Sequence, residues 1–162
     1  MGVDRRAVGE FWDSVKGQLG FPTSETDAVP EAWPFGTEDN PVLADQLLEL
    51  VLAGTKTGTA SAQWCYEEGE AIPYVGELSI ILDGAGVPRA VIRTSEIDIV
   101  PFDEVTKQHA YSEGEGDRTL ASWRRDHQAF FGHTLPADKP FSSKMPVICE
   151  KFELLWPQPN AK

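Results

Sequence analysis

The chain is poor in cysteine, in basic residues and in long apolar runs, and each shortage excludes a class of protein. Two cysteines in 162 residues, Cys65 and Cys149, are too few and too far apart for a disulfide framework or a zinc site. The 14 basic residues are outnumbered by 26 acidic ones, and the net charge of −12 disfavours broad binding to nucleic-acid backbones or anionic lipid. Apolar runs fall short of the roughly 20 residues that span a bilayer, and the charged start is unlike a signal peptide. We therefore expect a cytoplasmic protein with reduced thiols, no membrane association and, at most, local contacts to nucleic acid.

Motifs of several large enzyme classes are also missing. The sequence contains no Gly-x-Ser-x-Gly nucleophile turn, no phosphate-binding loop and no dinucleotide-binding glycine pattern. Its three histidines, His109, His127 and His133, lack the spacing of a helical zinc site, so we expect them to be structural or exposed. The length and the 41% hydrophobic content suit one globular domain over residues 1–162.

Hydrophobic periodicity predicts a helical N-terminal extension. Residues 4–19 follow helical spacing and end near Gly20. Residues 21–35 contain three prolines and little periodicity, which predicts an irregular arm anchored by Trp33 and Phe35. We expect residues 1–34 to pack on the domain as an extension, and exposed apolar surface on the arm would favour a homodimer.

The rest of the chain changes from a helix to strands and then to a mixture of both. Asn40-Pro41 predicts a helix start and Gly54 its stop. The predicted buried positions of this helix are Leu43, Leu47, Leu50 and Val51. Strands are predicted over 58–64, 77–82, 89–100 and 146–155, a hairpin turn over 83–86, and helices over 102–111 and 119–131. Strands and helices do not alternate as βαβ units, which indicates an α+β fold with a small, mostly antiparallel barrel or curved sheet.

Lys56 and Thr59 are the first candidates for chemistry. They follow the helix that stops at Gly54, and a desolvated lysine can act as a base or as an electrostatic partner of a nearby hydroxyl. The alternative is that Lys56 only complements the dipole at the end of that helix. Residues three apart on a regular strand point to opposite faces, so a shared pocket needs a bend, which Gly58 permits.

A second set of candidates lies further along the chain. Glu113, Glu115 and Asp117 alternate with two glycines and could face a hard cation, although the position of the twelfth EF-hand ligand holds Arg124. The alternative is a solvated loop pinned by Arg118. Trp123, Arg124 and Arg118 could contact a base and a phosphate, or could form a solvated helix face.

Four motifs occur in the order found in the ASCH domain family. They are Gly54-x-Lys56-x-x-Thr59, Pro73-x-x-Gly76, Pro101-Phe102-x-x-Val105-x-x-x-x-Ala110, and Glu113-Gly114-Glu115-Gly116-Asp117-x-x-Leu120-x-x-Trp123-Arg124. The chain from about residue 35 to 156 resembles that family. Its details, which include Thr59-Ala60-Ser61, Gly69-Glu70 and Cys149-Glu150-x-Phe152, resemble the longer bacterial branch with an N-terminal helical extension. The resemblance implies a PUA-like α+β fold, with a small, mostly antiparallel β-barrel flanked by helices and a cleft associated with RNA or nucleoside chemistry.

The resemblance also implies three functions. Some members of the family are amidohydrolases that deacetylate 4-acetylcytidine with a Lys, a Thr and a Glu, which fall on Lys56, Thr59 and Glu113 here. Other members resemble ribonucleases that cleave single-stranded RNA with a divalent metal, for which Glu113, Glu115 and Asp117 are the candidate ligands. The third function is noncatalytic binding of RNA or a nucleotide.

The expected contacts to a nucleoside or to RNA are Ser61, Arg118, Trp123 and Arg124. Ser61 replaces the Arg that usually lies two residues after the family's Thr, so one cationic contact to the substrate is missing. The amidohydrolase hypothesis needs no cofactor.

The protonation states of Lys56 and Glu113 are coupled. A neutral Lys56 near pH 7 requires its pKa to fall by about three units from roughly 10.4, which costs about 4 kcal/mol. An ionised Glu113 beside Lys56 would instead raise the pKa of Lys56. We therefore expect a charged Lys56 that stabilises an oxyanion and a Glu113 that acts as the base.

Overall fold

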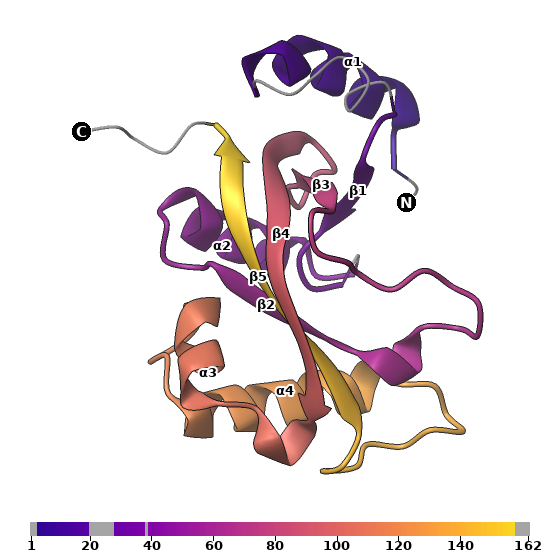
Figure 1. Ribbon diagram of the computed structural model, residues 1–162, viewed down its shortest axis with the longest axis vertical. Helices are drawn as coiled ribbons and strands as arrows, with labels where there is room; N and C mark the ends of the chain where they lie inside the picture. Colours follow the sequence, from indigo (N-terminus) through magenta and orange to yellow (C-terminus); the bar gives the residue numbers. More distant parts are fainter. Residues whose placement is uncertain (1–2, 20–27, 38, 158–162) are drawn as a thin grey trace. The chain divides into compact units, whose positions relative to one another are not determined.

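The computed structural model describes residues 3–19, 28–37 and 39–157. These residues form two compact units: residues up to 54 with 77–93 and those from 153 onward, and residues 55–76 with 94–152. Two long strands, β4 (Pro88–Pro101) and β5 (Pro146–Trp156), contribute residues to both units (Figure 1). All the candidate site residues belong to the second unit.

One five-stranded sheet has the order β1-β3-β4-β5-β2. Its shorter strands are β1 (Glu31–Pro34), β2 (Gly58–Ala62) and β3 (Leu78–Leu82). β1 runs parallel to β3, whereas β3 pairs with β4, and β2 with β5, in antiparallel register. The predicted α+β class with a mostly antiparallel sheet is therefore confirmed. Among the described residues, no helix is long and apolar enough to cross a membrane.

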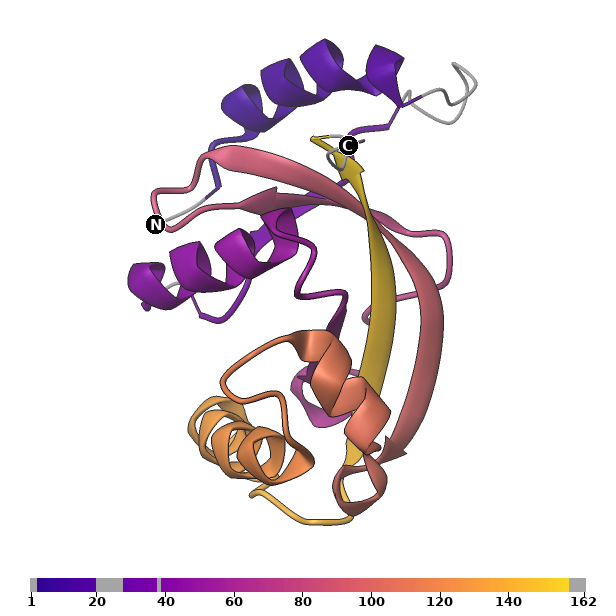
Figure 2. The same ribbon diagram turned by 90° about the vertical axis from the view of Figure 1, so that its left-hand side faces the viewer.

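In the first unit, two helices flank the sheet. α1 (Arg5–Val15) continues into a 3₁₀ turn, η1 (Lys16–Gln18), and buries Trp12 against Ile80 and Val91. α2 (Pro41–Leu52) begins where it was predicted, because the Asn40 side chain accepts a hydrogen bond from the Leu43 N–H. Figure 2 shows α1 and α2 on opposite sides of this part of the sheet.

Two predictions for the first unit need correction. The end of the expected irregular arm is strand β1, because the edge of β3 offers backbone partners to it. The buried stripe of α2 differs from the prediction at two positions: Ala44 and Leu48 are buried, whereas the predicted Leu43 and Leu50 are only half-buried. Phe35 is buried and its ring packs edge-on at 5.0 Å against that of Trp33, as predicted for the anchor. Residues 20–27 of the predicted arm lie outside the described residues.

In the second unit, four helical segments accompany β2 and the adjoining parts of β4 and β5. They are η3 (Gln63–Cys65), η4 (Phe102–Glu104), α3 (Lys107–Glu113) and α4 (Leu120–Thr134). The single helix predicted over 102–111 is therefore two segments. Val105 is extended, and the Thr106 hydroxyl starts a new helix by accepting from the His109 N–H at 3.1 Å. Thr119 caps α4 in the same way.

An aromatic cluster fills the core of the second unit. The Phe102 ring packs against the rings of Trp123, Phe131 and Phe141, with centroid separations of 5.4, 6.3 and 4.9 Å. Met145, just before β5, and Val147 of β5 are fully buried in the same cluster. This packing fixes α4 against the strands and so fixes the position of Trp123.

Candidate active site

The Lys56 side chain lies between two carboxylates in the segment just before β2. Its Nζ is 2.8 Å from Glu115 Oε2 and 3.4 Å from Glu113 Oε1. The ammonium also donates to the backbone carbonyl of Glu113 at 3.4 Å. The Lys56 and Glu113 side chains are only 1% and 2% exposed, whereas that of Glu115 is 31% exposed. A buried lysine and a buried glutamate from distant segments are thus brought into direct contact.

Three aromatic side chains complete the surroundings of the Glu113 carboxylate. Oε2 accepts from Trp123 Nε1 at 2.7 Å and lies 2.7 Å from His109 Nε2. Oε1 lies 3.4 Å from His127 Nε2. The His127 ring stacks on the Trp123 ring at 4.1 Å, which fixes the orientation of both. The carboxylate therefore has neighbouring donors on both oxygens.

These contacts keep Glu113 ionised. Burial by itself raises the pKa of the Glu113 carboxyl, but the Lys56 charge and the hydrogen bonds from His109 and His127 outweigh it. The net result is a pKa well below the ordinary value of 4.5. A charged Lys56 that stabilises an oxyanion stays a prediction.

The same carboxylate changes the titration of His127. Burial lowers the pKa of the His127 imidazole, but the hydrogen bond and the charge of Glu113, with a further contribution from Glu115, raise it above the usual 6.5. His127 therefore carries a proton over a wider pH range than a free histidine does.

The local sequence explains how Glu113 reaches Lys56. Glu113 is the last residue of α3, and Gly114 follows with a φ of 71°, in the left-handed conformation that favours glycine. A Cβ on Gly114 would lie 2.6 Å from the Thr55 carbonyl oxygen, so only glycine allows the two segments to approach this closely. The Thr57 N–H donates to the Ser112 carbonyl at 2.7 Å and joins the same two segments.

Thr59 lies in β2 rather than in the Lys56–Glu113 contact. Its register partner is Glu150, while the neighbouring pair Ala60 and Cys149 faces the aromatic cluster that contains Trp123. Because strand side chains alternate, Thr59 projects from the face of β2 opposite to that cluster. A catalytic role for Thr59 remains a prediction, as does the role of Ser61 on the same face, which accepts a hydrogen bond from the Tyr66 hydroxyl at 3.4 Å.

Gly58 has a different role from the one predicted. It does not have a positive φ. A Cβ at this position would instead lie 2.3 Å from Ser112 Oγ and 3.1 Å from the Glu150 carbonyl oxygen. Gly58 therefore provides space between α3 and β5, rather than the conformational freedom of a bend.

The predicted cationic contacts are engaged with the protein's own backbone. Arg118 donates to the carbonyls of Tyr111 and Thr55 at 3.1 and 3.3 Å and lies over the Tyr111 ring at 3.6 Å. Arg124 Nη2 donates to the Asp103 carbonyl at 2.9 Å. Trp123 is only 4% exposed. These contacts hold the loop and α4 in place, and substrate contacts by the three residues stay a prediction.

The three carboxylates of the acidic loop, residues 113–117, do not converge on one point. Glu113 and Glu115 both contact Lys56, whereas Asp117 accepts from the N–H and the hydroxyl of Thr119 at the start of α4. Within the described parts of the chain, no three His, Cys, Asp or Glu side chains gather as a metal site would require. The divalent-metal hypothesis has no preformed set of ligands in these residues.

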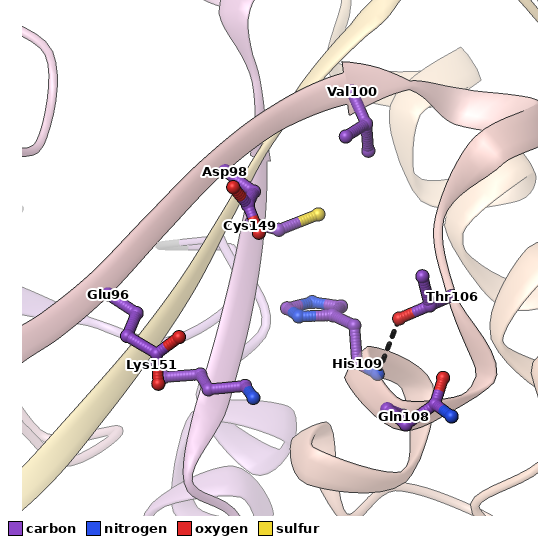
Figure 3. A pocket seen from close by; sticks show the side chains of 8 residues that line it. All are labelled: Glu96, Asp98, Val100, Thr106, Gln108, His109, Cys149 and Lys151. Carbon is purple, nitrogen blue, oxygen red and sulfur yellow. Dashed lines mark hydrogen bonds between the residues drawn. The ribbon is translucent and has the colours of Figure 1, made fainter.

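A small pocket adjoins the buried network on the other side of His109. Its volume is about 90 Å³, and it is lined by Glu96, Asp98 and Val100 of β4, by Thr106, Gln108 and His109 around the start of α3, and by Cys149 and Lys151 of β5. Figure 3 shows the His109 ring projecting into this space from α3. Burial, followed by the charges of Glu113, Asp98 and Glu150, raises the pKa of the Cys149 thiol to about 12, so the thiol is neutral at physiological pH.

His109 and His127 were not predicted as partners of Glu113. Part of the signal was present, because Glu113 follows His109 by four residues just after the helix predicted over 102–111, and Trp123 and His127 are four residues apart on the next predicted helix. Pairs at this spacing share a helix face, but the sequence does not show which faces meet. The packing of α3 against α4 brings the two pairs together.

The geometry defines a class of site: a buried, ionised Lys–Glu pair supported by two histidines and a tryptophan, within a PUA-like α+β fold. The chain belongs to the ASCH domain family, whose match covers residues 31–156. It is similar to protein EF3133 of Enterococcus faecalis V583, which is assigned to the family DUF984, with 32% identity and a TM-score of 0.81. That similarity covers 92% of this chain and 88% of the other.

The fold is also shared with an ASCH domain from Lactobacillus crispatus JV V101. The TM-score is 0.77 at 24% identity, and the match covers 96% of this chain and 97% of the other. No curated protein shows significant similarity to the chain. The resemblance inferred from the four sequence motifs is thus confirmed, and the family generally comprises RNA-binding or hydrolase-like proteins.

Proposed function

We propose that this protein is an ASCH-type hydrolase that cleaves the amide bond of an acylated cytidine-like nucleoside, with Lys56, Thr59 and Glu113 as its catalytic residues. The observation that carries the proposal is the buried contact between Lys56 and an ionised Glu113. Burying two opposite charges costs several kcal/mol per ion, and such pairs with perturbed pKa values concentrate at functional sites. The proposed substrate class is the one implied by the resemblance to the amidohydrolases of the ASCH family.

In the proposed mechanism, the Lys56 ammonium stabilises the oxyanion that develops on the substrate carbonyl. Glu115 is the partner of Lys56 that is partly open to solvent, at 31% exposure. Its movement toward water would free one side of the ammonium for the substrate, while Glu113 keeps the charge on Lys56. Thr59 or a water molecule attacks the substrate carbonyl, and Glu113 accepts the nucleophile's proton, through a water molecule where Thr59 attacks, because Thr59 projects from the other face of β2. The C–N bond then breaks as this proton passes to the departing cytosine amine. An acyl group transferred to Thr59 is released by water in a second step.

Thr59→Val is the sharpest test, because it removes a hydroxyl without changing the buried charges. Thr57→Val is the matched control, since Thr57 is exposed and its hydroxyl only makes a 3.4 Å contact with the Ser112 carbonyl. Hydrolysis of 4-acetylcytidine would be followed by absorbance. We expect Thr59→Val to lose about 100-fold or more in kcat/KM, in the range typical of losing a proton-transfer group, with Thr57→Val close to the parent.

Lys56→Met and Glu113→Gln complete the test, with thermal melts to show that the variants are folded. Folded variants that retain the parent's rate would reject the Lys-Thr-Glu site. A parent protein that does not hydrolyse acylated cytidine, but cleaves single-stranded RNA only with a divalent ion, would support the ribonuclease alternative. Saturable, salt-sensitive binding without turnover would support the noncatalytic alternative.

A further inference from the structure

The pocket beside His109 has an unpartnered acceptor at its base. His109 is only 6% exposed, and its Nε2 lies 2.7 Å from Glu113 Oε2. Because the Glu113 carboxylate is ionised and can only accept, the neutral imidazole tautomer that fits this contact has its hydrogen on Nε2 and its lone pair on Nδ1. Nδ1 has no hydrogen-bond partner among the described residues, and it is not one of the polar atoms sealed from solvent. Its lone pair is therefore open to the pocket.

The β4 wall of the pocket adds two carboxylates. Glu96 and Asp98 are two residues apart on β4, so they project from one face of the strand at a spacing of roughly 7 Å. Both side chains lie in the view of the pocket across from His109 (Figure 3). The Lys151 ammonium is the one cation of the described lining, and the Cys149 thiol is neutral. Apart from His109, the two carboxylates and one ammonium give the lining a net charge of −1.

The size and the chemistry of the lining favour one kind of ligand. A volume of about 90 Å³ is that of roughly three water molecules, which suits a small group rather than a whole nucleoside. Acceptors on the β4 wall and at the base favour a small cation whose donors point in several directions. A guanidinium is planar, always charged and carries five N–H donors in a fixed fork, whereas an ammonium is a compact point charge.

We propose that this pocket binds a guanidinium group, which donates to His109 Nδ1 at the base and to the carboxylates of Asp98 and Glu96 on the β4 wall. The site is separate from the proposed hydrolysis and does not depend on it. Its link to the buried network is structural: Glu113 fixes the His109 tautomer, and so creates the acceptor that the ligand uses.

Methylguanidinium is the probe, and methylurea is its neutral control of similar shape. The ring resonances of His109 would be followed by NMR during titration of the full chain with each compound. Methylguanidinium should shift them saturably, at millimolar concentrations, and methylurea should not. Absence of a saturable shift with methylguanidinium, or an equal shift with methylurea, would overturn the proposal.

Three variants, each of an exposed side chain, distinguish specific binding of methylguanidinium in the pocket from the general attraction of a cation to an acidic protein. Asp98→Asn should weaken binding about tenfold, as expected for the loss of a charge-assisted hydrogen bond. Lys151→Met should tighten it, because the repelling ammonium is removed. Glu104→Gln, which removes an exposed carboxylate outside the pocket, is the matched control and should bind as the parent does. Equal weakening by Asp98→Asn and Glu104→Gln would reject a specific pocket.

His109→Gln tests the acceptor at the base, since its amide can still donate to Glu113. We expect methylguanidinium binding to weaken in this variant, measured by calorimetry on protein shown to be folded. N-acetylarginine amide, titrated in parallel, distinguishes the source of the group. Tighter binding of this compound than of methylguanidinium would indicate a guanidinium carried on an arginine side chain, and weaker binding would indicate a free small cation.

Discussion

At the residue scale, the protein is organised around the Glu113 carboxylate. Lys56, His109, His127 and Trp123 reach it from three different segments of the chain. A buried carboxylate is tolerated only when its oxygens are paired, so each of these contacts supports the others. Removal of one partner should therefore cost more than the loss of an ordinary surface contact.

Lys56→Met tests this coupling through stability. The variant leaves the Glu113 carboxylate buried without its main counter-charge, and we expect the free energy of unfolding to fall by about 3–5 kcal/mol. Lys144→Met is the matched control, because Lys144 also forms an ion pair, 2.7 Å from Asp103, but its side chain is 75% exposed. Urea denaturation of both variants measures the difference. Equal, small losses would show that the buried pair contributes no special stability.

The pKa of Glu113 predicts the stability of the protein in acid. The pKa of Glu113 in the folded protein lies below its pKa in the unfolded chain. Its contribution to the free energy of unfolding is therefore fully present above about pH 4.5 and is lost as the pH falls through the lower, folded-state pKa. The raised pKa of His127 acts in the opposite direction, with a contribution that is complete below pH 6.5 and is lost as the pH rises through the higher folded value.

Denaturation series from about pH 3 to 8 would measure both effects. The parent should lose stability below pH 4.5, and Glu113→Gln should show a shallower loss there and a weaker dependence above pH 6.5. Parallel curves for the two proteins would contradict the assigned pKa directions. In the hydrolysis assay, the same low pKa predicts that the rate is not lost through protonation of Glu113 in mildly acidic solution.

At the scale of the elements, the turn after α3 positions the site. Gly114 ends the helix in a left-handed conformation and passes close to the Thr55 carbonyl, while Arg118 donates to that carbonyl from the other side of the acidic loop. The loop that the sequence suggested as a metal site is thus a helix end that is fastened to the segment before β2. Gly58 completes this close approach by leaving room for Ser112.

Two glycine-to-alanine variants should have opposite effects. Gly114→Ala places a Cβ 2.6 Å from the Thr55 oxygen at a φ of 71°, and we expect a loss of at least about 1–2 kcal/mol in unfolding free energy. Gly132→Ala lies within α4 with nothing inside 4 Å of the added Cβ, and it should gain up to about 1 kcal/mol. Thermal unfolding measures both. A stabilised Gly114→Ala variant would contradict the described turn.

At the scale of the whole molecule, the excess of acidic residues dominates. The net charge of −12 is mostly on exposed side chains, whereas the Lys56–Glu113 pair is buried. Salt screens exposed charges over about 10 Å at 0.1 M and buried pairs much less. At low ionic strength the exposed acidic side chains therefore repel one another and destabilise the folded protein. The buried Lys56–Glu113 pair is less sensitive to the ionic strength.

Raising NaCl from about 10 to 300 mM should raise the Tm of the parent by a few degrees, because the self-repulsion is screened. The difference in Tm between the parent and Lys56→Met should change little over the same range, since that pair is sealed from solvent. Differential scanning calorimetry in KCl at matched ionic strength controls for specific ion effects. A falling Tm would show that favourable surface pairs outweigh the repulsion.

The sequence determined most of the elements and two members of the site. Asn40-Pro41 and Gly54 bounded α2, the turn at 83–86 predicted the hairpin, and Lys56 and Glu113 were predicted as partners. These features depend on capping, turn chemistry and periodicity, which act between neighbours in the chain. Strand β1 was not predicted, because its partner strand lies more than forty residues away in sequence.

The surroundings of the Glu113 carboxylate depend on packing between segments that are distant in sequence. His109 and Trp123 carry no sequence signal that they meet on one oxygen, and the register of β2 with β5, rather than any motif, directs Thr59 toward the face of Glu150. The physical reason is that a buried charge must be paired wherever packing places it, and packing is set by side chains that are distant in sequence. The sequence supplied the charged groups, and the fold selected their partners.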